Sequence, residues 1–330
     1  MTQRTMDRIA DSPEVATGTA CGKVILLGEH AVVYGVPALA VGIERGVRAT
    51  ARLAPAGPSR LRVRGWDLEV TEEDSERDLG RALRAIVEVS RPARALAIEA
   101  EVDLPPGGGL GCSAAMGVAV ARAIDPAASS AVIAGRVMAW ERVFHGNPSG
   151  VDATVSAHGG CVLFEKGLDT EPVRAASALT LCVGHTGTAS STKSMVEAVS
   201  RMRARRPEVV EKAFEGIRAL VRNARLAIEA GDRFALGRLM DLNQMILSGL
   251  FVSTPEIEQM CGLARAAGAH GAKLTGAGGG GCVVALVSGS AGADGVLEAW
   301  RSAGFEAFAT RVAATEGHRL VLTERGETAP

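Results

Sequence analysis

The chain has 330 residues, of which 47% are hydrophobic and 22% are charged, and its net charge at pH 7 is −1. This composition is typical of a folded globular protein with one large core or two smaller ones, and it excludes long disordered tracts. The near-neutral balance and the scattered basic residues exclude a nucleic-acid surface. Any anion that binds must therefore be held by a few placed groups.

The sequence also restricts the compartment. No apolar run approaches the ~18 residues that a membrane span needs, and the N-terminal stretch MTQRTMDRIADSPEVATG has no apolar signal core. We therefore expect a cytoplasmic protein without membrane partners. The cysteines lie far apart and form no C-x-x-C pair, which favours reduced, buried thiols over zinc ligands or disulfides; they are Cys21, Cys112, Cys161, Cys182, Cys261 and Cys282.

The first third of the chain reads as strands. Residues 22–53 contain short apolar runs cut by glycine and proline, which predicts strands joined by turns. The stretches LRVRGWDLEV (61–70) and RALAIEAEVDLP (94–105) alternate apolar and polar residues, which predicts further strands.

Helical periodicity begins at Ser113 and continues to the Asp125-Pro126 pair. That pair predicts a stop and a restart, with Asp125 as the N-cap of a second helix and Pro126 in its first position. The second helix should extend to about His145, because one apolar stripe continues through it: Ile133, Val137, Trp140 and Phe144.

The remainder mixes both element types. We expect a strand at 179–185, long helices over 190–249, and a helix that begins at Thr254-Pro255. A strand at 282–288, a helix at 294–304 and strands at 306–313 and 318–324 should follow. Because strict βαβ alternation is missing, the sequence predicts an α+β protein with two lobes, which we place at residues 1–175 and 176–330.

A glycine-rich stretch, PPGGGLGCSAAMG (105–117), lies between a predicted strand and a predicted helix. The glycine amides and the first free N–H groups of the helix would point into one concavity at the positive end of the helix dipole. Such a concavity favours a phosphate group. A plain strand-to-helix turn would explain the same residues.

Two familiar phosphate motifs do not fit. GTACGKV (18–24) lacks the spacing of a Walker A loop. GAGGGG (276–281) satisfies G-x-G-x-x-G, but a strand follows it where a dinucleotide-binding fingerprint requires a helix. The second glycine run is therefore a turn or bulge, or a close approach of the backbone to another group.

Three charged residues stand out near these loops: Lys23 at the head of a buried-looking strand, Glu141 at the edge of an apolar stripe, and Asp152 after the loop GNPSG. Taken singly, each fits a surface or capping charge. Together with two glycine loops they match the parts that phosphoryl transfer needs, namely an anion cradle, Mg²⁺ ligands, a cation and an acceptor for the hydroxyl proton.

Four stretches resemble the signatures of one family, the GHMP kinases: GKVILLGEHAVVYGVPALA (22–40), PPGGGLGCSAAMG (105–117), ERVFHGNPSGVD (141–152) and KLTGAGGGGC (273–282). The resemblance extends from about Gly22 to Val284, with weak stretches between the motifs. It implies an ATP-dependent small-molecule kinase with an N-terminal lobe like ribosomal protein S5 and a ferredoxin-like C-terminal lobe. ATP and substrate would bind between the lobes.

The resemblance also implies roles for single residues. Asp152 would meet the substrate hydroxyl with Lys23 beside it, and Ser113 and Glu141 would hold Mg²⁺. Glu29, His30 and Gly279 would join Asp152 at the substrate. The ATP site would consist of Pro106, Gly107, Gly108, Gly109, Leu110, Gly111, Cys112, Ser113, Ala114, Gly278 and Gly279. Cys112 departs from the family, which usually has a serine there, so one hydrogen bond should be weaker.

Within the family, the order and spacing of the motifs favour the 5-hydroxyl of mevalonate as the phosphate acceptor. Phosphomevalonate is the alternative, although it would require additional cations and a first motif closer to GEY than to the GEH found here. Galactose fits less well, because AVVYG follows GEH in place of an Asp-Tyr pair. A non-catalytic member would be expected to lose its acidic and serine positions, whereas this chain keeps them. The oligomeric state stays open, with a homodimer as one candidate.

Overall fold

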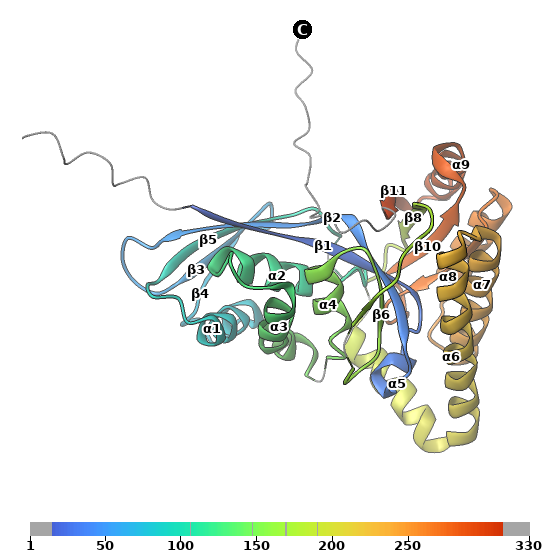
Figure 1. Cartoon of the computed structure of the whole chain (residues 1–330), viewed down its shortest axis with the longest axis horizontal. Helices are drawn as coiled ribbons and strands as arrows, with labels where there is room; N and C mark the ends of the chain where they lie inside the picture. The colour runs from blue at the N-terminus through green and yellow to red at the C-terminus, as the bar shows by residue number, and fades with distance from the viewer. Residues whose placement is uncertain (1–14, 106, 147, 169, 190, 313–330) are drawn as a thin grey trace, which may run out of the picture.

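The structure is a computed structural model, and it describes residues 15–105, 107–146, 148–168, 170–189 and 191–312. Figure 1 shows two sheets side by side, one with helices α1–α4 packed beneath it and one flanked by the long helices α6–α8. Pro106 and the strand expected at 318–324 lie outside the described residues. In the part of the chain that is described, no helix combines the length and the apolar character of a membrane span.

The N-terminal sheet is built around a long antiparallel hairpin of β1 (Ala16–Leu27) and β2 (Ala38–Leu53), connected through the short 3₁₀ helix η1 (Ala31–Tyr34). The pairing shifts register between Cys21 and Gly22, just before Lys23. The other strands are β3 (Arg60–Arg64), β4 (Leu68–Thr71), β5 (Leu96–Val102), β6 (Cys161–Phe164) and β7 (Glu171–Pro172), in the order β4-β3-β5-β2-β6-β7.

Four helices belong to this sheet: α1 (Asp78–Ser90), α2 (Cys112–Ile124), α3 (Ser130–His145) and α4 (Val151–His158). Helices α2 and α4 pack on β1 and β2, and α3 packs on α1, α2 and α4. The expected end of α3 at His145 is confirmed.

The predicted restart at Asp125 is wrong. Asp125 is the C-cap of α2, and its carboxylate accepts a hydrogen bond from Arg136 at 2.8 Å. Pro126 lies in a turn, and α3 begins only at Ser130. Ser129 is the N-cap, because its hydroxyl accepts the Val132 N–H. The Asp125 carboxylate is bound by Arg136, and Ser129, one turn later, caps α3 instead.

The C-terminal sheet contains β8 (Leu179–His185), β9 (Gly271–Thr275), β10 (Cys282–Val287) and β11 (Glu306–Val312), all antiparallel in the order β11-β8-β10-β9. Taken with the helices, this is the strand order of a ferredoxin-like βαββαβ unit. Its helices are α5 (Thr192–Arg205), α6 (Pro207–Ala230), α7 (Arg233–Gly249), α8 (Pro255–Ala266) and α9 (Gly289–Ser302). The expected start of α8 at Thr254-Pro255 is confirmed, with Thr254 as its N-cap. The α+β, two-lobed fold class is confirmed.

Among the described residues no strand belongs to both sheets, and the connection between them runs from the end of β7 at Pro172 to the start of β8 at Leu179. We propose that the lobes meet at residues 175/176 in this connection.

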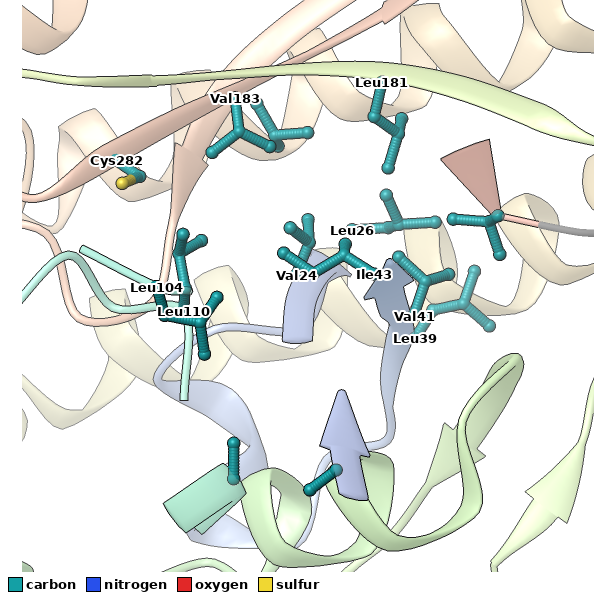
Figure 2. Close-up of a cluster of buried hydrophobic side chains, with 14 of the residues drawn as sticks. Val24, Leu26, Leu39, Val41, Ile43, Leu104, Leu110, Leu181, Val183 and Cys282 are labelled. Carbon is teal, nitrogen blue, oxygen red and sulfur yellow. The ribbon is translucent and has the colours of Figure 1, made fainter. Parts of the chain in front are cut away.

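Apolar side chains from both sheets form one core between the lobes. Figure 2 shows Val24, Leu26 and Ile43 of the first hairpin opposite Leu181 and Val183 of β8. All are buried, so solvent is excluded from this contact. The cysteines are all free; five of the six are buried and Cys112 is half-buried. This core fixes how β1, which carries Lys23, faces the second lobe.

Candidate active site

The glycine loop of the first lobe, residues 107–111, connects β5 to α2. Gly107, Gly109 and Gly111 have φ values of 70°, 75° and 72°, a region that side chains rarely adopt. Gly111 is the N-cap of α2, and no side chain caps that helix. The loop therefore leads its backbone directly into a helix N-terminus, the arrangement expected for an anion cradle. The following Cys112 thiol is neutral, because burial raises its pKa to about 11.

Lys23 lies beside this loop. Its N–H donates to the Leu110 carbonyl at 2.8 Å, which joins β1 to the loop. Its methylene chain passes Gly111, where a Cβ would lie 2.8 Å from the lysine Cγ. The ammonium Nζ then lies 3.0 Å from Oδ1 of Asp152. The lysine side chain is 3% exposed and the aspartate side chain 31%, so only the carboxylate of this pair faces solvent.

Asp152 occupies the first turn of α4, directly after the loop that ends at Gly150. Gly150 is the N-cap with φ 95°, which turns the chain so that the carboxylate points toward Lys23. A negative charge is favourable at this end of a helix. Strand β1 thus contributes the ammonium and helix α4 the carboxylate of an ion pair whose members lie far apart in the sequence.

Ser113 and Glu141 form a second pair. The Ser113 hydroxyl donates to Oε1 of Glu141 at 2.6 Å, and the Trp140 indole N–H donates to the Ser113 carbonyl at 3.0 Å. Burial, together with the nearby negative charge of Asp152, raises the pKa of Glu141 to about 7. His145 lies one turn further, with Nε2 3.6 Å from Oε2 of Glu141.

The structure therefore brings together four residues that the sequence analysis selected: Lys23, Ser113, Glu141 and Asp152. Their oxygens include a hydroxyl and two carboxylates. Within the described residues there is no group of three or more His, Cys, Asp and Glu side chains arranged to hold a metal ion. A metal at this site would therefore take most of its ligands from a substrate or from water.

The second glycine loop, residues 276–281, contacts the first one through backbone atoms. A Cβ at Gly276 would lie 3.1 Å from the Cα of Gly109, and a Cβ at Gly281 would lie 3.3 Å from the Gly108 carbonyl oxygen. On its other side, the Gly279 N–H donates to the Val252 carbonyl at 2.7 Å. The loop thus fills the space between the phosphate loop and the second lobe.

Glu29 and His30, the residues predicted to face the substrate, both contact the second lobe. His30 adopts φ 61°, and its Nε2 lies 2.8 Å from the Ala277 carbonyl oxygen. Oε1 of Glu29 pairs with the Lys273 ammonium, and Oε2 accepts a hydrogen bond from Nδ2 of Asn243 at 3.1 Å. Their predicted contact with the substrate stays a prediction.

Lys273 and Asn243 were not selected from the sequence. Both are 0% exposed. The signal for Lys273 was a lysine among apolar residues in the segment GAKLT, which calls for a buried partner. Nothing in the sequence around Asn243 distinguishes it from an ordinary polar residue of a helix.

The chain was compared with known proteins. The model for the GHMP kinases N terminal domain matches residues 79–160, and the model for GHMP kinases C terminal matches residues 224–306. The chain is 36% identical over 295 residues to a mevalonate kinase of Thermococcus gammatolerans, covering 81% of this chain and 88% of that protein. It is 37% identical over 300 residues to a mevalonate kinase of Pyrococcus horikoshii, covering 82% and 88%.

A solved structure agrees with these matches. The crystal structure of L. major mevalonate kinase in complex with R-mevalonate superimposes with a TM-score of 0.82, at 27% identity, and covers 94% of this chain and 99% of that chain. The fold and the site define an ATP-dependent kinase of small molecules. The chain belongs to the GHMP kinase family, as the four sequence motifs indicated.

Proposed function

We propose that the chain transfers the γ-phosphoryl group of ATP to the 5-hydroxyl of mevalonate. The observation that carries this proposal is the Lys23–Asp152 pair beside a glycine loop that opens a helix. The substrate is supported by the relatives, because the curated proteins reported above are mevalonate kinases and one related structure contains R-mevalonate. These likenesses bear out the expectation that the motif spacing raised.

The phosphates of ATP would be held by backbone amides. Residues 107–114 supply N–H groups at the start of α2, and the glycines leave room for oxygens to approach. Cys112 contributes its amide, whereas its neutral thiol adds no charge. Gly278 and Gly279 would contact the nucleotide from the second lobe. Pro106 belongs to the same proposal, although it lies outside the described residues.

Ser113 and Glu141 would hold Mg²⁺. The fit rests on a buried carboxylate with a hydroxyl at 2.6 Å, whose pKa is raised by burial and by the nearby charge of Asp152, so that a bound cation would stabilise its ionised form. Hard oxygen donors in this number suit Mg²⁺, which keeps several waters and usually takes only one or two protein ligands. When bound, the ion neutralises charge on the transferred phosphate.

Asp152 would orient the 5-hydroxyl and accept its proton. Its carboxylate is partly exposed, as a contact with a substrate requires, while the buried Lys23 ammonium holds one of its oxygens in place. Lys23 also places its ammonium group next to the reacting groups. The pair can thus align a nucleophile before phosphoryl transfer.

Phosphomevalonate is the competing substrate, and the buried cations speak against it. Lys23 and Lys273 are the buried lysines of the described residues, and each is paired with a carboxylate. Neither buried lysine is therefore free to pair with the phosphate group of phosphomevalonate. The cytoplasmic location and the homodimer remain predictions.

The test is an ADP-release assay with mevalonate, phosphomevalonate, galactose and homoserine side by side. We expect turnover with mevalonate at a kcat/KM at least ~100-fold above that of the others, since a site built around one substrate discriminates strongly against analogues that leave buried groups unpaired. Equal or higher kcat/KM with phosphomevalonate would reject the proposal.

A further inference from the structure

A buried ionic cluster joins the two lobes. Glu29 follows β1 of the first lobe and is 1% exposed, while Lys273 of β9 and Asn243 of α7 come from the second lobe and are 0% exposed. Both oxygens of the Glu29 carboxylate are engaged, Oε1 by Lys273 and Oε2 by Asn243. Lys273 also donates to the Leu274 carbonyl oxygen. Each carboxylate oxygen thus bonds a side chain of the other lobe.

The cluster belongs to a row of contacts between the same two segments. The Ile25 N–H donates to the Thr275 hydroxyl at 2.9 Å, two residues from Lys273. On the other side, His30 contacts the Ala277 carbonyl at 2.8 Å. Residues 25–30 and 273–277 are thus connected at three successive places, and the glycine loop 276–281 begins inside this row.

Burial makes the cluster sensitive to the relative position of the lobes. An ion pair taken out of water offsets its desolvation cost only when the geometry is good, and removing one partner leaves an uncompensated buried charge. Oδ1 of the Asn243 side chain has no hydrogen-bond partner among the described residues, and Nδ2 of the same side chain donates to Glu29. A small displacement of the lobes would lengthen these hydrogen bonds and leave the charges of Glu29 and Lys273 without good partners.

We propose that Lys273 and Asn243 are positioning residues, which hold Glu29 and thereby fix the second glycine loop against the phosphate loop. Lys273 lies three residues before Gly276, whose backbone contacts Gly109 in the cradle for ATP. The cluster therefore sets the affinity for ATP through the loops. The inference rests on the proposed function of the site.

The experiment is a double-mutant cycle with Lys273→Met and Glu29→Gln, using Lys166→Met, at an exposed lysine, as the matched control. For each protein we would measure Tm, the Kd for MgATP by calorimetry, and kcat and KM for both substrates. We expect Lys273→Met to raise the Kd and KM for ATP on the order of ten-fold, since small misplacements distant from the chemistry have effects of this size or larger. The KM for mevalonate should change less than about two-fold.

The double variant distinguishes the roles. Removing both charges leaves no buried charge without a partner, so the double variant should have a lower Kd for MgATP and a higher Tm than Lys273→Met alone. A cluster with a merely structural role would lower Tm but leave the Kd for ATP of the folded protein unchanged, which would overturn the proposal. A raised KM for mevalonate in Glu29→Gln and in the double variant, with an unchanged Kd for MgATP in all variants, would also overturn it, because the cluster would then act on the substrate and not on the nucleotide.

The calorimetric Kd for MgATP is independent of mevalonate. If the wild type bound ATP but did not turn over mevalonate, the proposed function would fail while the cycle would still report on the cluster. If the wild type turned over mevalonate normally but Lys273→Met left the Kd for MgATP unchanged, the proposed role of the cluster would be rejected and the proposed function would stand.

Discussion

The glycine loop at 107–111 leads into helix α2, whereas the glycine loop at 276–281 leads into strand β10. The first supplies a helix N-terminus beside Lys23, Ser113 and the two carboxylates. The second lies between the first loop and the main chain at Val252 and Thr188, with a Cβ at Gly278 only 2.1 Å from the Val252 carbonyl oxygen. Two stretches of similar composition thus differ in structure: the first presents a helix N-terminus, whereas the second packs its backbone against neighbouring main chain and would reach the nucleotide only through Gly278 and Gly279.

Glycine content alone therefore does not identify a phosphate site. The element that follows the glycines decides, because only a helix offers free N–H groups and a dipole at its start. We therefore expect substitutions at the first loop and its charged neighbours to alter catalysis, and substitutions at the second loop to alter stability first. The following four experiments test this division.

The largest effect is expected from Asp152→Asn, which keeps the shape of the side chain and removes its charge. A positioned base contributes ~10²–10⁴-fold, so kcat should fall at least ~100-fold while the Kd for MgATP stays nearly unchanged. Asp103→Asn, at an aspartate whose side chain is 72% exposed, is the control and should leave kcat intact. Should Asp152→Asn keep more than about a tenth of the wild-type kcat, Asp152 is not the base.

Glu141→Gln tests the metal site of the first lobe. The amide preserves the volume and a hydrogen bond to Ser113, but it removes the charge that would attract Mg²⁺. We expect the Mg²⁺ concentration for half-maximal activity to rise roughly 10- to 100-fold. A titration of activity against Mg²⁺ at saturating ATP measures it. A wild-type titration curve would show that Glu141 is only a buried partner of Ser113.

Gly278→Ala tests the second loop. A Cβ there would collide with backbone at Val252 and would also be strained, since φ is 73°. Clash and strain together should lower the free energy of unfolding by about 3 kcal/mol. Gly304→Ala is the matched control, with φ 87° and open space around the Cβ, and should lose only about 1 kcal/mol. A raised Kd for ATP without loss of stability would break the division between the loops.

The smallest effect concerns pH in the absence of Mg²⁺ and nucleotide. The pKa of Glu141 is about 7 in the folded chain against an ordinary 4.5, so the folded state binds the proton more tightly. This contribution is complete below pH 4.5 and is lost as the pH rises through about 7. Wild type should therefore lose about 2 kcal/mol relative to Glu141→Gln between pH 5 and 7.5. Urea unfolding at both pH values measures it, and a constant difference would contradict it.

Local patterns predicted much of this molecule. The apolar stripe that ends at His145 gave the boundary of α3, and the run of glycines before Ser113 gave the loop that opens α2. Both rest on interactions between neighbours in sequence. The predicted restart at Asp125 was wrong. The Asp125 side chain accepts a hydrogen bond from Arg136 and caps no following helix, whereas Ser129 caps α3.

What the sequence did not reveal are pairings between distant segments. Glu29 and Lys273 are 244 residues apart, and neither neighbourhood states which charge will meet the other. The motif resemblance selected Glu29 for a substrate contact, which stays a prediction, and it did not indicate that Lys273 and Asn243 bond the carboxylate. Buried charges must be paired, but sequence alone does not name the partner.

That separation also bears on how the protein is made. Chains emerge from the ribosome with the N-terminus first, and a domain can fold before the next one exists. The hairpin of β1 and β2 and its helices are complete once residue 172 has emerged, yet Glu29 then has no counter-charge until β9 follows about a hundred residues later. A nascent chain that ended before β9 would keep this carboxylate in water and would lack the second glycine loop. The buried ion pair and the contact between the two glycine loops can therefore form only after β9 and the loop that follows it have been synthesised.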